Sequence, residues 1–389
     1  MVPKLKSRQG RHIITRGGKE MSYLGIDLHS NNFTVYRIEV GDLRKNSQIR
    51  KYSLAEGSFN EFLESLRIDD CILVEASTNT FWFYDLVRPY VKECLVYNVN
   101  KTKSDGNKTD KIDARKLAEK LAFYKLLGNK EEFPVVYVPS KEARELRSLI
   151  TTYRLLGKMI TQSKNRIHAL FKQSGICVEK SAIENKEFKT FIDQINISNI
   201  YKVQIKILLR QLKNSKEEQQ NIKDTIYVLG NKLYRKEIEI LLSIKGFSPF
   251  TAIVLMSDIV DIKRFKNSKK FCAYLRTAPK IKESNDKTRL GSVNKQSRKA
   301  TCAVLAQSAN HFKTAGDHMT TFYQRIKKGK SAGKSRMALL RKILVSAYHM
   351  LDRGELFYWV ENDLYLKKLK EFDKELNKIQ FNGKLQEAA

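Results

Sequence analysis

Long hydrophobic runs are missing from this sequence of 389 residues. A helix that spans a membrane needs about 18 or more consecutive apolar residues, and no run reaches that length. No signal peptide is visible at the start of the sequence either. We therefore expect a cytoplasmic protein that has no helix in the membrane.

Cysteine is also scarce, and its pattern excludes cysteine-based metal motifs. The cysteines are odd in number, scattered, and without the spacing of metal ligands. Most of them lie inside apolar runs, so we expect reduced thiols in the core, as is usual in the cytoplasm. The five residues are Cys71, Cys94, Cys177, Cys272 and Cys302.

Acidic residues are few relative to basic ones. The chain has 73 Lys and Arg against 42 Asp and Glu, which leaves a formal net charge of +31. So large an excess favours a polyanionic partner, through electrostatic steering and the release of counterions. Nucleic acid is the first candidate, and a membrane surface is its rival.

The length suits two or three domains, at roughly 100–200 residues each. An apolar content of 42% is enough for a hydrophobic core. Six basic residues among the first twenty predict a flexible basic arm. The expected segments are a basic arm at 1–20, an α/β domain at 21–139, a helical region at 140–242, a C-terminal domain at 243–360 and a charged tail at 361–389.

Two acids occur in apolar runs that have the length of buried strands. Asp27 lies in the first run and Glu75 ends a later one. A buried acid is costly unless a cation or a hydrogen bond compensates it, so both positions are candidates for a site. Strands that alternate with helices in this way predict an α/β layer. The predicted strands span residues 23–29, 33–38, 71–75 and 95–99.

Asp110 and Asp113 stand three residues apart at the start of a predicted helix, and so project from the same face. Hard cations such as Mg²⁺ take oxygen ligands, typically one or two carboxylates together with substrate phosphate oxygens. The pair therefore suits Mg²⁺, or Mn²⁺ with the same oxygens, and a solvated face of alternating charges is the alternative. Flanking cations are Lys108, Lys111 and Arg115, and the expected apolar side is Ile112, Leu117 and Leu121.

The region from residue 140 to about residue 242 repeats apolar residues every seven positions. A narrow apolar seam of this kind favours coiled-coil packing, within the chain or between chains. An ordinary amphipathic helical domain is the alternative. The seam runs first through Leu146, Tyr153, Ile160 and Ile167, and then through Ile205, Leu212, Ile226 and Leu233.

Residues 241–252 predict two helices joined by a tight turn at Gly246, and the second helix starts near Ser248-Pro249. Such a helix-hairpin-helix-like segment would hold a nucleic-acid phosphate on its turn amides, beside Lys245. A plain helical corner is the alternative. The C-terminal domain as a whole is predicted to be mostly α-helical.

Two later stretches concentrate the positive charge and predict contacts with nucleic acid. Residues 263–299 hold 13 basic and two acidic residues, and residues 325–342 hold eight basic and no acidic ones. The candidate contacts are Lys280, Lys282, Lys287, Arg289, Lys295, Arg298, Lys299, Arg325, Lys327, Lys328, Lys330, Lys334 and Arg336.

The acids and the residues around them resemble a known family. Asp27, Glu75, Asp110 and Asp113 look like the four-carboxylate site of RuvC-like, ribonuclease H-type nucleases. The sequence motifs around these acids resemble still more closely those of the DEDD transposases of bacterial insertion sequences and the related pilin-gene invertases. The blocks that carry the resemblance are Gly25-Ile26-Asp27, Glu75-Ala76-Ser77-Thr78 and Lys108-Thr109-Asp110-x-x-Asp113-Ala114-Arg115.

The segment 278–292 resembles the C-terminal motif of the same family, in which a serine precedes two small residues and then basic residues and glycine. That match implies Ser284 as a nucleophile, with Ser292 as its competitor. Two departures weaken the match. Asn285-Asp286 stand where glycines are usual, and Gln296-Ser297 replace a common Arg-Gly. Without the family, this polar and turn-rich segment would make the serine an ordinary turn residue.

The resemblance also implies partners. Members of the family work on donor and target DNA with a structured non-coding bridge RNA, and act as dimers, or tetramers on DNA, in the bacterial cytoplasm at the nucleoid. The implied activity is DNA cutting and rejoining through a phosphoserine link, with Mg²⁺ at the acids. A RuvC-like metal-dependent structure-specific endonuclease and a non-catalytic nucleic-acid-binding protein are the alternatives.

Overall fold

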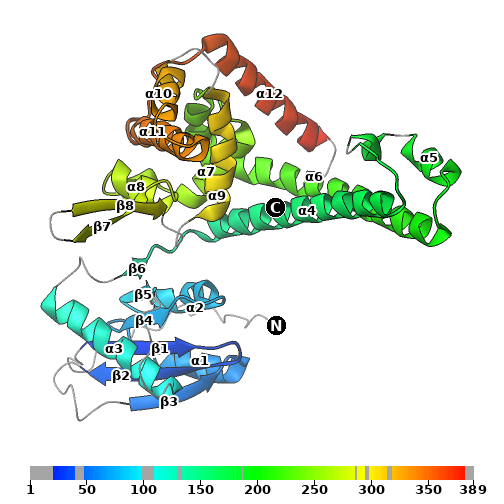
Figure 1. Ribbon diagram of the computed structural model, residues 1–389. Helices are drawn as coiled ribbons and strands as arrows, with labels where there is room; N and C mark the ends of the chain where they lie inside the picture. Colours follow the sequence, from blue (N-terminus) through cyan, green and yellow to red (C-terminus); the bar gives the residue numbers. More distant parts are fainter. Residues whose placement is uncertain are drawn as a thin grey trace. The chain divides into compact units, whose positions relative to one another are not determined.

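The computed structural model divides the chain into two compact units, Met1–Val138 and Pro139–Ala389, and each is taken by itself below (Figure 1). The predicted basic arm at 1–20, Lys108 and Lys295 lie outside the described residues. The structure describes residues 21–39, 48–98, 109–128, 134–179, 181–185, 187–284, 287–293, 298–312 and 318–381.

The N-terminal unit is built on a mixed sheet in the order β3-β2-β1-β4-β5-β6. β1 is central, with β2 antiparallel on one side and β4 parallel on the other. β4 and β5 are also parallel, and the pairs β2–β3 and β5–β6 are antiparallel. The strands are β1 Ser22–Leu28, β2 Asn32–Glu39, β3 Gln48–Ser53, β4 Cys71–Glu75, β5 Glu93–Tyr97 and β6 Val135–Val136.

Helices cover both faces of this sheet because successive residues of a strand point to opposite sides. Leu24 and Ile26 of β1 belong to a core that includes aromatic side chains from α1 (Glu56–Ser65) and α2 (Thr80–Val87), which continues into the 3₁₀ turn Arg88–Tyr90. Tyr23 lies on the other face, in a core with residues of α3 (Asp110–Leu127). The odd-numbered residues of β1 therefore face α3.

Gly25 explains how closely α3 packs on this face. A Cβ atom at Gly25 would lie 2.1 Å from the carbonyl oxygen of Ala114 and 2.3 Å from the amide nitrogen of Ala118. Only a residue without a side chain admits a backbone at that distance. The close approach brings the start of α3 to the sheet face that carries Asp27.

The apolar side predicted for α3 is wrong at one residue. Leu117 and Leu121 are buried, but the side chain of Ile112 is 38% exposed. Five residues separate Ile112 from Leu117, which places them about 140° apart around the helix. The buried face continues instead through Ala114 and Ala118.

The C-terminal unit consists mainly of helices. None of the helices among the described residues combines the length and the hydropathy needed to cross a membrane. The elements are α4 Lys141–Gln173, η2 Ala182–Glu184, α5 Phe188–Gln194, α6 Asn199–Leu242, α7 Pro249–Ile259, η3 Ile262–Arg264, α8 Ser268–Tyr274, β7 Pro279–Ser284, β8 Lys287–Val293, α9 Lys299–Ser308, η4 Ala309–Phe312, α10 His318–Lys327, α11 Ala332–Arg353 and α12 Asn362–Phe381.

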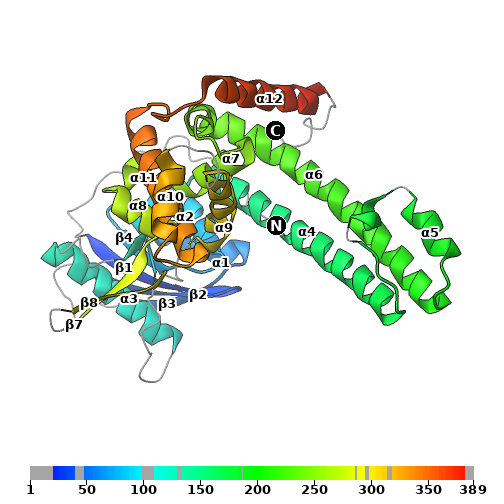
Figure 2. The same cartoon turned by 45° about the horizontal axis from the view of Figure 1, so that its top comes forward.

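α4 and α6 lie side by side (Figures 1 and 2). Ile167 of α4 shares one core with Ile205 of α6 and with α5, and Leu146 shares another with Ile226. The two helices are therefore antiparallel and pair within the chain. The heptad residues that are buried in the structure contribute to this pairing, while coiled-coil geometry and a role in dimerisation stay predictions.

α6 and α7 form the predicted pair of helices around Gly246. α7 begins at Pro249, and the Ser248 hydroxyl accepts a hydrogen bond from the amide of Thr251 at 3.2 Å, which caps the helix. A Cβ at Gly246 would lie 2.4 Å from the carbonyl oxygen of Ser308. Glycine is thus required here by packing against the end of α9.

The segment predicted to be rich in turns within a helical domain is instead a β-hairpin. β7 and β8 pair antiparallel, with Ser284 opposite Lys287. Parts of both strands, residues 280–282 and 287–290, alternate polar residues with an apolar or β-branched one, a pattern typical of strands, and only Asn285-Asp286 separate the two strands. Its dense positive charge concealed that alternation in the sequence.

Candidate active site

A row of polar residues crosses four neighbouring strands on the face that α3 covers. Asp27 pairs with Thr34 of β2, and Thr34 pairs with Lys51 of β3. On the other side, Ile26 pairs with Val74 of the parallel β4, so Asp27 and Glu75 each follow directly after that pair. Residues opposite one another in a sheet share a face. The fold therefore gathers Lys51, Asp27 and Glu75 from distant parts of the sequence.

The start of α3 adds carboxylates to this row. Thr109 caps the helix, since its side chain accepts a hydrogen bond from the amide of Ile112. Asp110 and Asp113 occupy the first turn. Negative side chains are favoured there, because the unpaired amides at a helix N-terminus carry partial positive charge.

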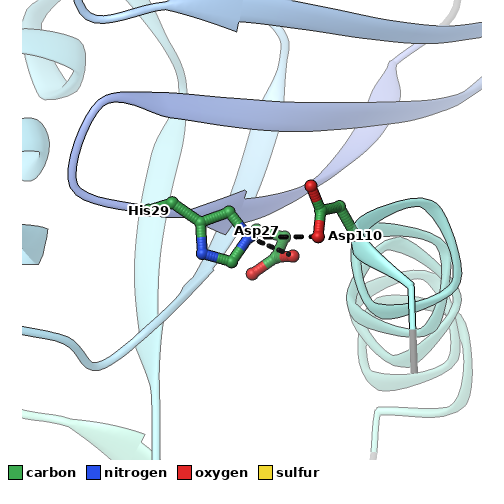
Figure 3. Close-up of side chains that lie close together, drawn as sticks. All are labelled: Asp27, His29 and Asp110. Carbon is green, nitrogen blue, oxygen red and sulfur yellow. Dashed lines mark hydrogen bonds and ion pairs between the residues drawn. The ribbon is translucent and has the colours of Figure 1, made fainter.

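Among the described residues, Asp27, His29 and Asp110 form a close group of possible metal ligands (Figure 3). One ligand atom from each lies within 4.8 Å of the others. His29 Nε2 is 3.1 Å from Asp27 Oδ2 and 3.4 Å from Asp110 Oδ1. Lys51 Nζ is 3.2 Å from the other oxygen of Asp110. This group thus combines a residue of β1, a residue just after β1 and the first residue of α3.

The electrostatics of this group leave negative charge in excess. Burial raises the pKa of Asp27, whose side chain is 13% exposed; His29 opposes that change, and the charges of Asp110 and Asp113 add to it. The hydrogen bond from Lys51 lowers the pKa of the more exposed Asp110. A divalent cation would relieve the repulsion among these acids. The donor set, carboxylates with one imidazole, also fits such an ion.

The structure places the four predicted carboxylates in two ways. Asp27 and Asp110 belong to the group within 4.8 Å. Glu75 ends β4 beside Asp27, and the charge of Asp113 raises the pKa of Asp27. Neither residue is part of that group. The sequence reasoning missed His29 and Lys51. His29 stands two residues after Asp27, so strand alternation would have placed both on one face.

The candidate nucleophile lies in the C-terminal unit, on the hairpin. Ser284 is the last residue of β7, and its competitor Ser292 lies in β8. The hairpin also carries Lys280, Lys282, Lys287 and Arg289, and Lys299 begins α9. For this hairpin we describe the course of the backbone and the pairing of its two strands.

Several predicted nucleic-acid contacts have structural partners. Lys245 pairs with Glu361 at 2.5 Å, and Arg115 pairs with Glu119 one helical turn away at 2.7 Å. Arg298 lies 3.4 Å from the buried Asp258 and donates a hydrogen bond to the hydroxyl of Tyr274. Contacts within the chain therefore account for these three cations without a bound nucleic acid.

A second set of predicted cations is directed to solvent. Its members pair with no carboxylate among the residues that the structure describes. Most of them surround the turn between α10 and α11, where Arg336 is half-buried. This surface suits a phosphate backbone better than the paired cations do. The exposed members are Lys111, Arg325, Lys327, Lys328, Lys330 and Lys334.

The free cysteines agree with the predicted core thiols, except at one position. Cys71, Cys94, Cys272 and Cys302 are buried and Cys177 is exposed. Burial raises the pKa of the Cys94 thiol to about 12. These four buried thiols are therefore poor candidates for nucleophilic chemistry.

Comparison with known proteins gives matches in both units. A family model described as a transposase of the DEDD type matches residues 24–176, and a model described as the transposase IS116/IS110/IS902 family matches residues 238–324. A curated relative is the transposase for insertion sequence element IS1111A from Coxiella burnetii. It is 20% identical over 364 residues, which cover 88% of this chain and 93% of the relative. The chain belongs to the DEDD-type transposases of insertion sequences.

Proposed function

We propose that this protein cuts and rejoins the DNA strands of an insertion sequence. A divalent metal site at Asp27, Glu75, Asp110 and Asp113 and a serine nucleophile at Ser284 would perform the reaction. The metal is Mg²⁺ or Mn²⁺, and a bridge RNA selects the DNA. Membership of the family and the geometry of the acids support this assignment.

The observation that carries the proposal is the convergence of Asp27 and Asp110. They lie 83 positions apart in the sequence, yet both contact His29, and α3 reaches the sheet because of Gly25. A solvated helix face would not bring a half-buried strand carboxylate into contact with the helix terminus. Among the residues that the structure describes, no buried arginine compensates Asp27 in the way that Arg37 compensates Asp70.

The reaction is a pair of transesterifications. The Ser284 hydroxyl oxygen attacks the phosphorus of a DNA phosphodiester, loses its proton, and forms a phosphoserine link while the bond to the leaving deoxyribose oxygen breaks. That oxygen takes up a proton. A deoxyribose hydroxyl of the second strand then attacks the same phosphorus and releases the serine, so the number of phosphodiester bonds is conserved.

The residues of the chain have separate roles in this scheme. A divalent ion, when bound to the acids, would act as a Lewis acid on phosphate oxygens. Lys280, Lys282, Lys287 and Arg289 would neutralise the charge that develops on the phosphate. Exposed cations from Arg325 to Lys334 would hold the nucleic-acid backbone without reading its sequence.

Bridge RNA and self-association complete the proposal. A net charge of +31 suits a chain that binds two kinds of nucleic acid through their backbones. Sequence selection by RNA pairing leaves the protein to recognise backbone and shape, as in other RNA-guided systems. The α4–α6 pair is the proposed dimerisation arm.

A second candidate function is a metal-dependent structure-specific nuclease in which water is the nucleophile. It is favoured by one observation: the described acids of the site all come from the N-terminal unit. In that case the acids would be essential and Ser284 dispensable.

Strand cleavage tests the proposed function. The full chain would be combined with RNA transcribed from the flanks of its element, labelled donor and target DNA, and Mg²⁺ or Mn²⁺. We expect cleavage and joining that chelation abolishes, and a loss of about 100-fold or more in Asp27→Asn and Asp110→Asn. The exposed Asp69→Asn is the matched control. Cleavage that persists after chelation, or in both site variants, would refute the metal site, and joining that needs no RNA would refute guidance by RNA.

A further inference from the structure

His29 is the member of the close group that is not a carboxylate. It lies just beyond β1, and its imidazole is 46% exposed. We propose that His29 is a nitrogen ligand of the metal at this site and that it makes the site prefer Mn²⁺ over Mg²⁺. This inference rests on the proposed function, because it concerns the ion held by the same acids.

The distances suit three ligands of one ion. In an octahedral site with metal–ligand bonds of ~2.1 Å, neighbouring ligand atoms stand ~3 Å apart. His29 Nε2 is 3.1 Å from Asp27 Oδ2 and 3.4 Å from Asp110 Oδ1. The imidazole nitrogen therefore stands where a ligand next to both carboxylates would stand.

The backbone of His29 is fixed on both sides. Its amide donates a hydrogen bond to the carbonyl oxygen of Asn32 at 2.9 Å, within the β1–β2 hairpin. Its carbonyl oxygen accepts a hydrogen bond from Asn79 Nδ2, also at 2.9 Å. Asn79 occupies the N-cap position of α2, in the segment that follows Glu75. The ring is thus held near the acids by the same segments that position Asp27 and Glu75.

Lys51 contributes to the orientation of Asp110. Its Nζ atom contacts Oδ2 of Asp110, while Oδ1 is the oxygen nearest to His29. The two oxygens of this carboxylate therefore have different partners. Oδ1 is left to share an ion with His29 and Asp27, and Oδ2 stays paired with the lysine.

Donor type decides which ion this arrangement favours. Mg²⁺ binds oxygen ligands and gains little from an imidazole. First-row transition metals accept both carboxylate oxygen and imidazole nitrogen, and Mn²⁺ combines this tolerance with the oxygen-rich coordination of Mg²⁺. A site of acids alone would bind both ions through the same oxygens, so the preference comes from the nitrogen of His29.

Metal binding without catalysis tests the inference. The full chain, freed of metal, would be titrated with Mn²⁺ by electron paramagnetic resonance, and Mg²⁺ would be added as competitor. We expect His29→Ala to weaken Mn²⁺ binding about tenfold and Mg²⁺ binding less than about threefold. His29→Asp, which supplies oxygen in place of nitrogen, should bind both ions and lose the preference. The exposed His311→Ala is the matched control.

Two results would overturn the inference. Mn²⁺ affinity in His29→Ala equal to that of the wild type would do so, as would an equal loss for both ions, which would mean that His29 only positions the acids. Asp27→Asn and Asp110→Asn separate this failure from that of the proposed function. If they lose both ions while His29→Ala keeps its Mn²⁺ affinity, the metal site stands and the nitrogen ligand is wrong. If they bind both ions as the wild type does, the metal site and the inference fail together.

Discussion

The two units surround a buried carboxylate in opposite ways. Asp258, in the C-terminal unit, lies near Arg147 and Arg298 and accepts a hydrogen bond from the Thr301 hydroxyl. Asp27, in the N-terminal unit, lies among other acids with the half-exposed His29 as its contact. The first acid has its charge compensated by the protein. The pKa of the second is raised by burial and by the neighbouring acids, and a bound cation would oppose both effects.

The charge of the neighbours distinguishes residues that stabilise the fold from candidate site residues better than residue type does. Both acids end or follow apolar segments, and both are largely buried. What differs is the sign of the neighbours. The same criterion divides the cations, since Arg298 and Lys245 have carboxylate partners while the described lysines around the α10–α11 turn do not.

The largest loss of stability should come from removing Asp258, the acid whose charge two arginines compensate. Asp258→Ala leaves Arg147 largely buried without its carboxylate partner, and we expect a loss of about 3 kcal/mol in the free energy of unfolding. Asp27→Asn should change that free energy by less than about 1 kcal/mol, since burial already disfavours its charge. Denaturant unfolding of both variants measures the difference. Equal losses would contradict the contrast between the two acids.

The next largest loss of stability should come from a side chain at Gly25, which would occupy the space that α3 needs. Gly25→Ala forces a Cβ against the backbone of Ala114 and Ala118, which should cost about 2 kcal/mol and displace Asp110. Gly246→Ala creates a similar clash with Ser308 in the other unit. We expect it to lower stability without changing Mn²⁺ affinity, whereas Gly25→Ala lowers both.

Gly57→Ala is the control for both substitutions. Nothing lies within 4 Å of a Cβ at Gly57 in α1, and the change should be neutral or stabilise by about 0.5 kcal/mol. If Gly25→Ala kept full Mn²⁺ affinity, the close approach of α3 would not be what positions the acids.

The smallest effect concerns a buried cation of the C-terminal unit. Lys368 donates hydrogen bonds to the carbonyl oxygens of Leu242 and Ile244, and burial lowers its pKa from 10.5 to about 8. Between those two pH values the unfolded chain holds a proton that the folded chain has released, so stability rises with pH there. Lys368 is half-buried, so screening by solvent reduces the change to about 1 kcal/mol.

Lys368→Met should remove that rise, measured by urea unfolding at pH 7.5 and at about pH 10. The exposed Lys370→Met should keep it, which excludes a general effect of charge. A rise of the same size in Lys368→Met would assign the pH dependence to groups other than Lys368.

The sequence was sufficient for parts of the site that depend on local pattern. Apolar runs with acids placed Asp27 and Glu75 on their strands, and the two acids three residues apart placed the start of α3. Lys51 could not be foreseen, because it reaches the site through the register of β2 and β3. The serine motif came from resemblance, and its hairpin was missed because cations obscured the alternation of the strands.

Charge alone also failed to separate the roles of the cations. Lys245, Arg115 and Arg298 have the same sequence character as Lys328 or Lys334. Their acidic partners are Glu361, Glu119 and Asp258. Two of these partners are distant in the sequence, and only tertiary packing identifies them.

One reaction, as we propose it, needs both the acids of the N-terminal unit and the serine of the C-terminal hairpin. Its most direct measurement is a denaturing gel that detects a covalent link between the protein and labelled DNA, with the RNA and Mn²⁺ or Mg²⁺ present. We expect an adduct in the wild type and in Ser292→Ala, and none in Ser284→Ala or Asp110→Asn. DNA cleaved without an adduct, and unaffected by Ser284→Ala, would contradict it and assign the reaction to hydrolysis by the acid site.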